Sequence, residues 1–343
     1  MRSIVYTKPG DSSVLELVEQ ETPEPGPGEV RVRVVVSGVN PTDWKARAGG
    51  TYGDGLPFPA ITPNQDGAGI VDAVGDGVDR LAVGDRVWLF MSAAGRPTGT
   101  AQEYTVVPAT RAVPLPDDTS FDVGASLGVP AMTAHRALTT HEHGPSRLSP
   151  GALSGKHVLV AGGAGAVGHA AIQLARWAGA TVTSTISSDA KAALATAAGA
   201  HHTVNYRDDD AADQIRRIAP DGVDIVVEVS IPQNAALVAE VLANHGVVSI
   251  YANNGGDEAT IPVRPNMSIN ARYQFVLLYT IGDEALAAAA EDVSAALRDG
   301  ALPVGEDAGL PLTRFPLEQT AAAHDAVEGD TVGKVLIDVA EAD

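Results

Sequence analysis

The sequence contains no cysteine among its 343 residues. Disulfides, thiolate nucleophiles and every cysteine-ligated zinc site are therefore excluded. Long apolar runs are also missing, so no segment has the length and hydrophobicity of a membrane span. Residues 1–6 have the pattern of a β-strand rather than of a secretory signal peptide. We therefore expect a cytoplasmic protein without a membrane partner.

Basic residues are scarce, and most of them are arginine. The chain carries 23 lysines and arginines against 43 aspartates and glutamates, which gives a formal net charge of −20. Such a charge repels nucleic-acid backbones and anionic membranes, so we expect no nucleic-acid partner. An acidic, lysine-poor surface is typical of adaptation to high salt and also of ordinary acidic cytoplasmic enzymes. The sequence leaves both origins open.

What the chain does contain is a glycine motif between a strand and a helix. An apolar strand is predicted at 157–161, and the glycines Gly163, Gly165 and Gly168 follow with the spacing G-x-G-x-x-G. An alanine-rich helical pattern and a second apolar strand at 180–186 complete a βαβ unit. The glycines allow a tight turn, close approach of a pyrophosphate and close helix–strand packing. The sequence therefore predicts a dinucleotide site at the start of this helix.

The residues after the second strand indicate which dinucleotide binds. NAD sites usually carry Asp or Glu there to hold the ribose 2′-OH. This chain has Ser187, Ser188 and then Lys191, which suit a 2′-phosphate that a carboxylate would repel. Asp189 lies close enough to contact the ribose, but we favour a role as N-cap of a helix beginning at Ala190. The prediction is NADPH rather than NADH.

The pattern of elements predicts two domains of an α/β protein. Short strands separated by Gly and Pro turns fill the N-terminal part, including a hairpin of 4–6 with 15–18 and an alternating strand at 30–36. From 157 onward strands and helices alternate as in a doubly wound sheet. The final strand, at 334–339, is expected to return to the β-rich domain. We place that domain at 1–124 and 301–343, and the nucleotide-binding domain at 125–300.

Three smaller expectations can be checked against the structure. Thr42 or Asp43 is expected to cap a short helix that carries Trp44. Residues 272–279 have the pattern of one further strand. The His-x-His of His141 and His143 matches metal-ligand spacing, but we interpret it as an exposed loop pair because the sequence offers it no other ligand set. No metal site is predicted.

Several motifs give the chain a family resemblance. They lie in the expected order at 38–41 (Gly-Val-Asn-Pro), 50–52 (Gly-Thr-Tyr), 63–69, 84–87 (Gly-Asp-Arg-Val), 164–168 and 333–334 (Gly-Lys). With them the chain resembles the medium-chain dehydrogenase/reductase superfamily and is similar to its zinc-free quinone oxidoreductases, the ζ-crystallin type. The resemblance spans nearly the whole chain. It implies a GroES-like β-rich catalytic domain joined to a Rossmann domain, and a homodimer formed by the edge strand of the latter.

The resemblance also bears on zinc and therefore on the reaction. Where a zinc-dependent member would carry its cysteine, this chain has Asn40, and the Gly-His-Glu of such members is replaced by Asn-Gln-Asp at 64–66. Without a Lewis acid an alkoxide is hard to stabilise, whereas reduction of a polarised double bond needs only hydrogen-bond donors and a proton. We expect hydride transfer from NADPH to a small quinone or enone.

Candidate donors to the substrate oxygen are Asn40, Asp43 and Tyr52. Their alternative roles are a turn amide before Pro41, a helix cap and an exposed loop aromatic. We favour function for Asn40 and Tyr52 because both match family positions, whereas the two roles of Asp43 are balanced. Whether Tyr52 donates a proton or closes over the nicotinamide is open.

The resemblance implies further cofactor contacts. Thr133 is expected near the nicotinamide, and Ser187, Lys191 and Tyr206 around the 2′-phosphate, where Tyr206 either stacks on the adenosine or simply packs at a strand end. Tyr251 and Asn253 are expected at the cofactor edge of the sheet. The complete predicted set is Thr133, Gly163, Gly165, Ala166, Val167, Gly168, Ser187, Lys191, Tyr206, Tyr251, Asn253 and Lys334.

Other functions fit parts of the pattern. An acryloyl-CoA or other enoyl-thioester reductase, or a 2-alkenal reductase, would share these motifs. An NADPH-binding structural or RNA-binding protein with little catalysis is the alternative of another class, against which the acidic charge counts. Reduction of simple ketones is disfavoured by the missing zinc ligands. The sequence does not identify the physiological substrate.

Overall fold

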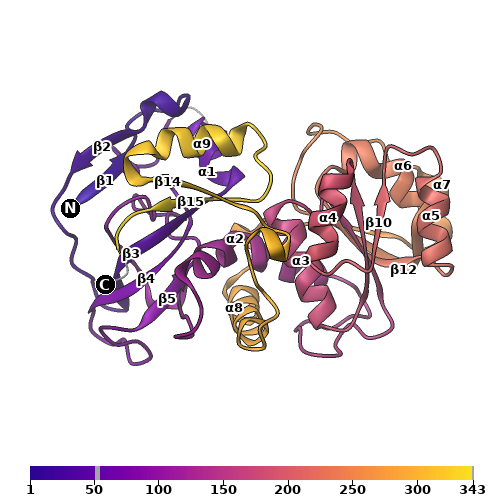
Figure 1. The fold of residues 1–343 in the computed structure, drawn as a ribbon, viewed down its shortest axis with the longest axis horizontal. Coiled ribbons are helices and arrows are strands. Elements are labelled where there is room, and N and C mark those ends of the chain that lie inside the picture. The colour runs from indigo at the N-terminus through magenta and orange to yellow at the C-terminus, as the bar shows by residue number, and fades with distance from the viewer. Residues whose placement is uncertain (51–54, 342–343) are drawn as a thin grey trace. The chain divides into compact units, whose positions relative to one another are not determined.

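A computed structural model describes residues 1–50 and 55–341 (Figure 1). The chain forms two compact units, Met1–Val129 with Pro311–Asp343, and Pro130–Leu310. The predicted boundaries differ slightly from these. Residues 125–129 belong to the first unit, and 301–310 to the second. The second difference has a visible cause, because helix α3 (Ala166–Trp177) holds this segment through hydrogen bonds from Gln173 Nε2 to Pro303 O and between His169 Nε2 and Ala308 O, both 2.8 Å.

The first unit is built around a seven-stranded sheet in the order β14-β15-β3-β4-β5-β7, with β6 paired to β3. Its strands are β3 (Glu29–Val39), β4 (Asp66–Val74), β5 (Arg86–Leu89), β6 (Tyr104–Pro108), β7 (Ala112–Pro114), β14 (Leu312–Pro316) and β15 (Lys334–Asp338). The alternation predicted for 30–36 is confirmed at its start, since Val30, Val32 and Val34 are fully buried while Arg31 and Arg33 are partly exposed. Val30 and Val32 face a core shared with β4, β5 and β6, whereas Val34 packs in a second core with Ile4 of β1 and Val335 of β15.

The ends of the chain meet on this unit. The predicted hairpin is confirmed: β1 (Arg2–Val5) pairs antiparallel with β2 (Glu16–Glu19), with the short helix η1 (Ser12–Val14) between them. The predicted return of the tail is confirmed as well, because β15 pairs antiparallel with β3. The remaining helical segments of the first unit are α1 (Pro41–Arg47), η2 (Ala109–Arg111), η5 (Leu317–Gln319) and α9 (Thr320–Glu328). Helix α2 (Phe121–Leu138) begins in this unit and ends in the second.

The second unit holds a parallel six-stranded sheet in the order β10-β9-β8-β11-β12-β13. Numbered from β8, this is the 3-2-1-4-5-6 order of the doubly wound nucleotide-binding fold. The strands are β8 (His157–Ala161), β9 (Thr181–Ile186), β10 (His202–Asn205), β11 (Val223–Glu228), β12 (Leu242–Ile250) and β13 (Arg272–Phe275). The helical segments are α3, α4 (Asp189–Ala197), α5 (Ala211–Ile218), α6 (Ile231–Val241), α7 (Val263–Ser268), η3 (Leu278–Thr280), α8 (Asp283–Arg298) and η4 (Glu306–Ala308).

The strand predicted at 272–279 is only half as long. β13 ends at Phe275, and η3 begins at Leu278. The cause is the partner strand, since Phe275 is paired with Ile250, the last residue of β12. Beyond that point β13 has no β12 residue to continue the ladder.

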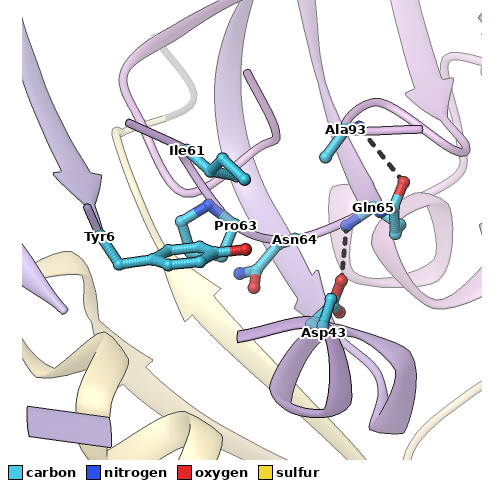
Figure 2. A pocket seen from close by; sticks show the side chains of 8 residues that line it. Tyr6, Asp43, Ile61, Pro63, Asn64, Gln65 and Ala93 are labelled. Atoms are coloured by element: carbon cyan, nitrogen blue, oxygen red, sulfur yellow. Dashed lines mark hydrogen bonds between the residues drawn. The ribbon is translucent and has the colours of Figure 1, made fainter. Parts of the chain in front are cut away.

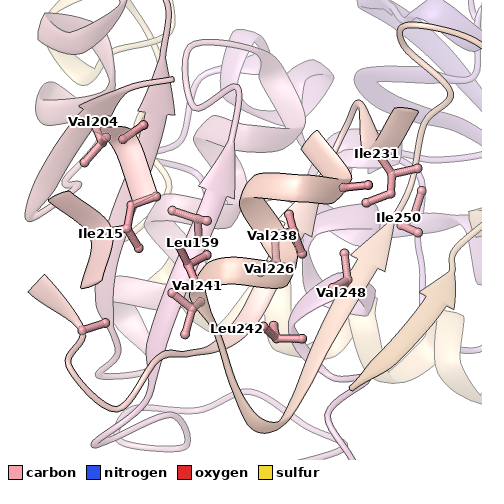
Figure 3. Close-up of a cluster of buried hydrophobic side chains, with 14 residues drawn as sticks. Leu159, Val204, Ile215, Val226, Ile231, Val238, Val241, Leu242, Val248 and Ile250 are labelled. Carbon is pink, nitrogen blue, oxygen red and sulfur yellow. The ribbon is translucent and has the colours of Figure 1, made fainter. Parts of the chain in front are cut away.

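Packing of α5 and α6 against the sheet makes a large apolar core (Figure 3). Its labelled members are Leu159, Val204, Ile215, Val226, Ile231, Val238, Val241, Leu242, Val248 and Ile250, each at most 4% exposed. Burial of so many branched side chains provides most of the driving force for folding of this unit. It also anchors β8, β10, β11 and β12 in a sheet whose carboxyl edge is where a doubly wound fold binds its ligand. Among the described residues, no helix is both long and apolar enough to cross a membrane.

Candidate functional site

The glycine motif forms a turn between β8 and α3 that leaves the helix start uncapped. Gly162 has a φ of 72°, a left-handed conformation that favours glycine. The N-cap of α3 is Gly165, whose lack of a side chain leaves the first N–H groups without a side-chain acceptor. The first turn also contains no acidic residue. An anion can therefore use these N–H groups and the positive end of the helix dipole.

Steric contacts explain why the motif needs its glycines. A Cβ atom on Gly163 would lie 2.3 Å from Ser184 Oγ, and one on Gly168 would lie 2.3 Å from the Gly162 carbonyl oxygen. At Gly165 the nearest atom would be 3.5 Å away. Gly163 and Gly168 thus serve close packing, and Gly165 leaves the turn open for a ligand. Ala166 and Val167 follow in the first helical turn and are half-buried. These residues fit a pyrophosphate.

The helix that follows β9, α4, has a different N-cap residue from the one we expected. The N-cap of α4 is Ser188, whose Oγ accepts the Lys191 N–H at 3.4 Å, and Asp189 is already the first helical residue. The predicted capping role of Asp189 is therefore wrong. The extended backbone of Ser188, with a φ of −164°, directs its hydroxyl to the helix start. Asp189 instead places its charge in the first turn, where the helix dipole favours it.

A basic and aromatic group adjoins the tip of β9. The Tyr206 N–H donates to Ile186 O at 3.1 Å, so the end of β10 lies beside Ser187. Tyr206 is 44% exposed and offers a ring face, and the guanidinium of Arg207 lies 6.0 Å from its centroid. Arg207 was missed from the sequence, although a cation directly after Tyr206 at a strand end is a readable signal. With the half-buried Lys191, these groups suit a 2′-phosphate.

The other predicted cofactor residues of the second unit lie on α2 and after β12. Thr133 is 6% exposed on α2. Tyr251 follows β12 directly, and its pKa is raised by burial and by the neighbouring Glu228 carboxylate. Asn253 donates through its amide to Asp257 at 2.6 Å. Glu228 itself was missed: it ends β11, is 1% exposed and accepts a hydrogen bond from Asn234 Nδ2 at 2.9 Å. Burial raises the pKa of this carboxyl.

In the first unit, a buried polar network forms around Asn40. Its amide Nδ2 donates to Asp66 Oδ2 at 2.7 Å, and its Oδ1 accepts from Lys334 Nζ at 2.7 Å. Lys334 Nζ also lies 3.7 Å from Asp66 Oδ2. All three side chains are at most 2% exposed. Lys334, predicted among the cofactor residues, thus has its ammonium inside the first unit, where it compensates a carboxylate.

Asn40 also begins α1, which corrects the cap prediction. Asn40 is the N-cap and Pro41 the first helical residue, so neither Thr42 nor Asp43 is the N-cap, although the Asp43 side chain takes part in the capping box. Proline favours this first position because its fixed φ suits the helix and it needs no N–H acceptor. Asp43 is the third helical residue, and its Oδ2 accepts the backbone N–H of Asn40 at 2.7 Å. Trp44 lies on this helix as predicted.

Asp43 joins α1 to the segment that precedes β4. Its second oxygen accepts the Gln65 N–H at 3.1 Å, and Gln65 Oε1 accepts the Ala93 N–H at 3.2 Å (Figure 2). Beside Asp43 lies a pocket of about 10 Å³, lined also by Tyr6, Ile61 and Pro63. A pocket of this size holds about one water molecule. The geometry gives Asp43 a positioning role through its two backbone contacts.

Asp66 occupies a gap made by a kink in α2. Gly128 is non-helical, with φ −12° and ψ −112°, and this frees the N–H of Val129 to donate to Asp66 Oδ1 at 2.9 Å. A Cβ atom on Gly128 would lie 2.0 Å from that oxygen, so only glycine fits. Asp66 therefore has hydrogen bonds on both oxygens although it is fully buried. Neither the kink nor this role of Asp66 was predicted.

A further group supports the segment 64–66 from behind. Asn64 has a φ of 77°, which asparagine tolerates better than most residues. Its Nδ2 donates to Ser37 Oγ at 2.9 Å, and its Oδ1 accepts from His324 Nε2 at 2.9 Å. Burial, and then the nearby Arg47 charge, lowers the pKa of His324 to about 3, so this imidazole is neutral and donates. These contacts orient the residues that stand where zinc-dependent members carry Gly-His-Glu.

Charge in the buried network is balanced by one proton. Burial and the Asp66 charge raise the pKa of Asp43 to about 8. Burial also raises the pKa of Asp66 and lowers that of Lys334, each against the attraction of the other. Two carboxyls and one ammonium carry no net charge when Asp43 keeps its proton. Tyr52, the remaining predicted donor, lies outside the described residues.

This protonation state makes stability depend on pH. The folded pKa of Asp43, about 8, exceeds its ordinary value of 3.8, so the folded state binds the extra proton between those values. The stability that this proton contributes is complete below about pH 4 and is lost as pH rises through about 8. Between these values the free energy of unfolding falls by up to about 1.4 kcal/mol per pH unit. We expect Asp43→Asn to remove this slope in urea unfolding measured from pH 5 to 8.

The amide of Asp43→Asn accepts one backbone N–H fewer, which lowers stability by a similar amount at every pH and leaves the slope test intact. Equal slopes in the wild type and the variant would contradict the assignment.

Comparison with known proteins identifies the family and supports the two-part fold. The GroES-like domain family of alcohol dehydrogenases matches residues 26–117, and the zinc-binding dehydrogenase family matches 166–295. The rat quinone oxidoreductase is 32% identical, with 98% of this chain and 97% of that protein covered. The chain belongs to the quinone oxidoreductase-like family of the medium-chain dehydrogenase/reductase superfamily. Both the family and the two-part fold predicted from the sequence are confirmed.

Other members of the superfamily extend the comparison. A 2-haloacrylate reductase of a Burkholderia species is 29% identical, with 98% of each chain covered. Among solved structures, an NAD-dependent alcohol dehydrogenase superposes with a TM-score of 0.86 at 29% identity, covering 99% of this chain and all of the other. The Escherichia coli quinone oxidoreductase complexed with NADPH gives 0.80 at 25% identity, covering 98% and 99%. The structural neighbours thus include proteins named for both cofactors, and this chain's own residues must decide between them.

Proposed function

We propose that this protein transfers hydride from NADPH to quinones or α,β-unsaturated carbonyl compounds without a catalytic metal. The observation that carries the proposal is the Asn40–Asp66–Lys334 network. The cation that compensates Asp66 there is an ammonium, and Asn40 Oδ1 is already hydrogen-bonded to it. A zinc ion bound by these groups would have to displace Lys334, so the chemistry of this unit favours hydrogen-bond donation over Lewis-acid catalysis.

NADPH is the proposed cofactor. The uncapped start of α3 suits its pyrophosphate, and Ser187, Lys191, Tyr206 and Arg207 suit its 2′-phosphate. The tip of β9 lacks the carboxylate that would hold a free ribose hydroxyl before the helix begins. The name of the Escherichia coli relative supports the same choice. Thr133, Tyr251 and Asn253 remain proposed contacts to the same molecule.

The proposed role of Asn40 follows from the charges around it. Bound NADPH would supply the hydride that adds to a quinone or to the β-carbon of an enone. Negative charge then develops on the substrate oxygen and needs a donor. The Lys334 ammonium draws electron density from the Asn40 amide through Oδ1, which strengthens the amide N–H groups as donors. We assign the second Nδ2 hydrogen to this oxygen, with Tyr52 as a further donor or a lid.

Activated alkenes are included because the Burkholderia relative is named as a reductase of one. The test uses NADPH deuterated at the reactive C4 position with trans-2-hexenal. We expect hexanal that carries the label at its β-carbon, while the α-carbon takes its proton from solvent. Label at the carbonyl carbon of an alcohol product would show carbonyl reduction and would overturn the proposal.

We further propose a homodimer formed through β13. This strand is the edge of its sheet, and Met267, Phe275 and Leu277 nearby are 66%, 69% and 58% exposed. Apolar side chains beside an open sheet edge favour pairing with a second copy. Light scattering after size exclusion should show a dimer that Phe275→Asp converts to monomer. A wild-type monomer at micromolar concentration would contradict the proposal.

A further inference from the structure

Three side chains with metal-ligating atoms meet at the amino-terminal end of the second unit's sheet. They are Glu142 and His143, from the loop after α2, and His245 of β12, and their ligand atoms all lie within 4.8 Å of one another. The His143 and His245 rings are nearly perpendicular, with centroids 5.7 Å apart. His245 adopts a φ of 62°, and its N–H donates to Ile269 O at 2.7 Å. One ligand is therefore held by the sheet, and two come from a loop about a hundred residues earlier.

The set differs from the His141–His143 pair that the sequence displays. The expectation of an exposed pair is wrong for His141, which is buried; its Nδ1 accepts the N–H of His143 at 3.1 Å, so this ring orients the loop. The third ligand, His245, carries no motif of its own and is brought in by the fold. Glu142 Oε1 is paired with Arg272 Nη2 at 2.6 Å, which leaves the other carboxylate oxygen for a metal.

We propose that Glu142, His143 and His245 form a binding site for a divalent transition metal such as Zn²⁺ or Ni²⁺. Two imidazoles and one carboxylate favour such ions over Mg²⁺ and Ca²⁺, which prefer oxygen ligands. Ligands of a tetrahedral zinc lie about 3.4 Å apart, so the ligand atoms must approach one another by up to about 1.4 Å. Glu142 and His143 are exposed on a loop and can make this movement by rotamer changes.

The site lies away from the cofactor turn. Val247 of β12 pairs with Arg272, the first residue of β13, so the cluster is at the amino ends of these parallel strands. The glycine turn follows the carboxyl end of β8 in the same sheet. A metal held here would tie the 140–147 loop to the sheet and stabilise the folded state by binding to it alone. It would take no part in hydride transfer.

The test is calorimetric titration of the metal-free, full-length protein with Ni²⁺ and Zn²⁺, alongside thermal unfolding. We expect one site per chain and a higher Tm with either metal, and neither effect with Mg²⁺. His245→Asn keeps the positive φ accessible and should weaken binding by at least about tenfold, the lower end of what losing even an outer-shell partner costs. Arg272→Gln should tighten binding, because it frees the carboxylate of Glu142.

His202→Ala is the matched control, since it removes another exposed histidine at the start of a strand outside this set. It should bind metal like the wild type. Equal binding by His245→Asn and wild type, or equal loss in His202→Ala, would overturn the site. NADPH oxidation is measured on the same samples. Unchanged turnover with and without metal is expected, so failure of the metal site and failure of the proposed reaction are distinguishable.

Discussion

Replacing Lys334 with methionine is expected to lower the free energy of unfolding of the first unit by about 3–5 kcal/mol, the usual cost of leaving a buried charge without its partner. The substitution keeps the length of the side chain but removes the ammonium beside Asn40 and Asp66. Asp66 is fully buried, so water does not replace the lost cation. The remaining carboxyls must then be protonated or paired again, which costs free energy in either case.

The measurement is urea unfolding followed by tryptophan fluorescence in a Trp177→Phe background. Trp44 and Trp88 then report on the first unit alone. Arg2→Met is the control, because Arg2 pairs with Glu103 at a partly exposed site of the same unit, where an ion pair contributes about 1 kcal/mol or less. Adding Asp66→Asn to Lys334→Met should recover part of the loss, since no buried charge is then left unpaired. A loss in Lys334→Met no larger than in the control would contradict the network's role.

Replacing Lys191 with alanine is expected to lower kcat/KM for NADPH by about tenfold to a hundredfold, because a hydrogen bond to a charged group contributes about 1.5–3 kcal/mol. The value for NADH should stay within about twofold, since NADH lacks the phosphate that we propose this ammonium contacts. Arg207→Ala should act in the same direction, because Arg207 lies beside Tyr206 at the end of β10. Ser187→Asp should have the largest effect on cofactor preference, since a carboxylate at this position repels the phosphate and can accept a ribose hydroxyl.

Lys8→Ala removes an exposed lysine of the first unit and serves as control; it should leave both cofactors unaffected. Parallel losses with NADH and NADPH in Lys191→Ala would contradict the 2′-phosphate assignment. They would show instead that this lysine contacts a part of the cofactor that NADH and NADPH share.

The βαβ part of the second unit was predicted well from the sequence because the residues that specify it are neighbours in the chain. The strand, glycine turn, helix and next strand occupy residues 157–186 without interruption, and Gly163 and Gly168 meet steric needs within that unit. The predicted element boundaries were wrong where a neighbouring strand or turn decides where an element begins or ends. The strand after Arg272 ends early because β12 ends, and Ser188 rather than Asp189 caps α4 because the backbone turns one residue sooner.

Of the network around Asn40, the sequence predicted only those residues that lie in recognisable motifs. Asn40, Asp43 and Lys334 were each named, but their contact was not, because it joins residues that are 294 positions apart. Asp66 was predicted only as a replaced zinc-site position, and not as a carboxylate that accepts two hydrogen bonds and pairs with Lys334. Its partner Val129 becomes available only through the Gly128 kink. Gly128 and Pro130 are a local signal of such a break, but the sequence does not show that Asp66 fills it. His245 joins the metal-ligating set for the same reason, since only the sheet brings it to the loop.

The most direct test of the proposed chemistry is steady-state oxidation of NADPH after exhaustive treatment with a chelator. The acceptors are 9,10-phenanthrenequinone, trans-2-hexenal and a simple ketone. Our account predicts turnover of the quinone or the enal at the same rate before and after treatment, none with the ketone, and slower reaction with NADH. Activity that disappears with the chelator and returns with zinc would contradict it, as would preference for the ketone. Tight NADPH binding without turnover of any acceptor would contradict the enzymatic function altogether.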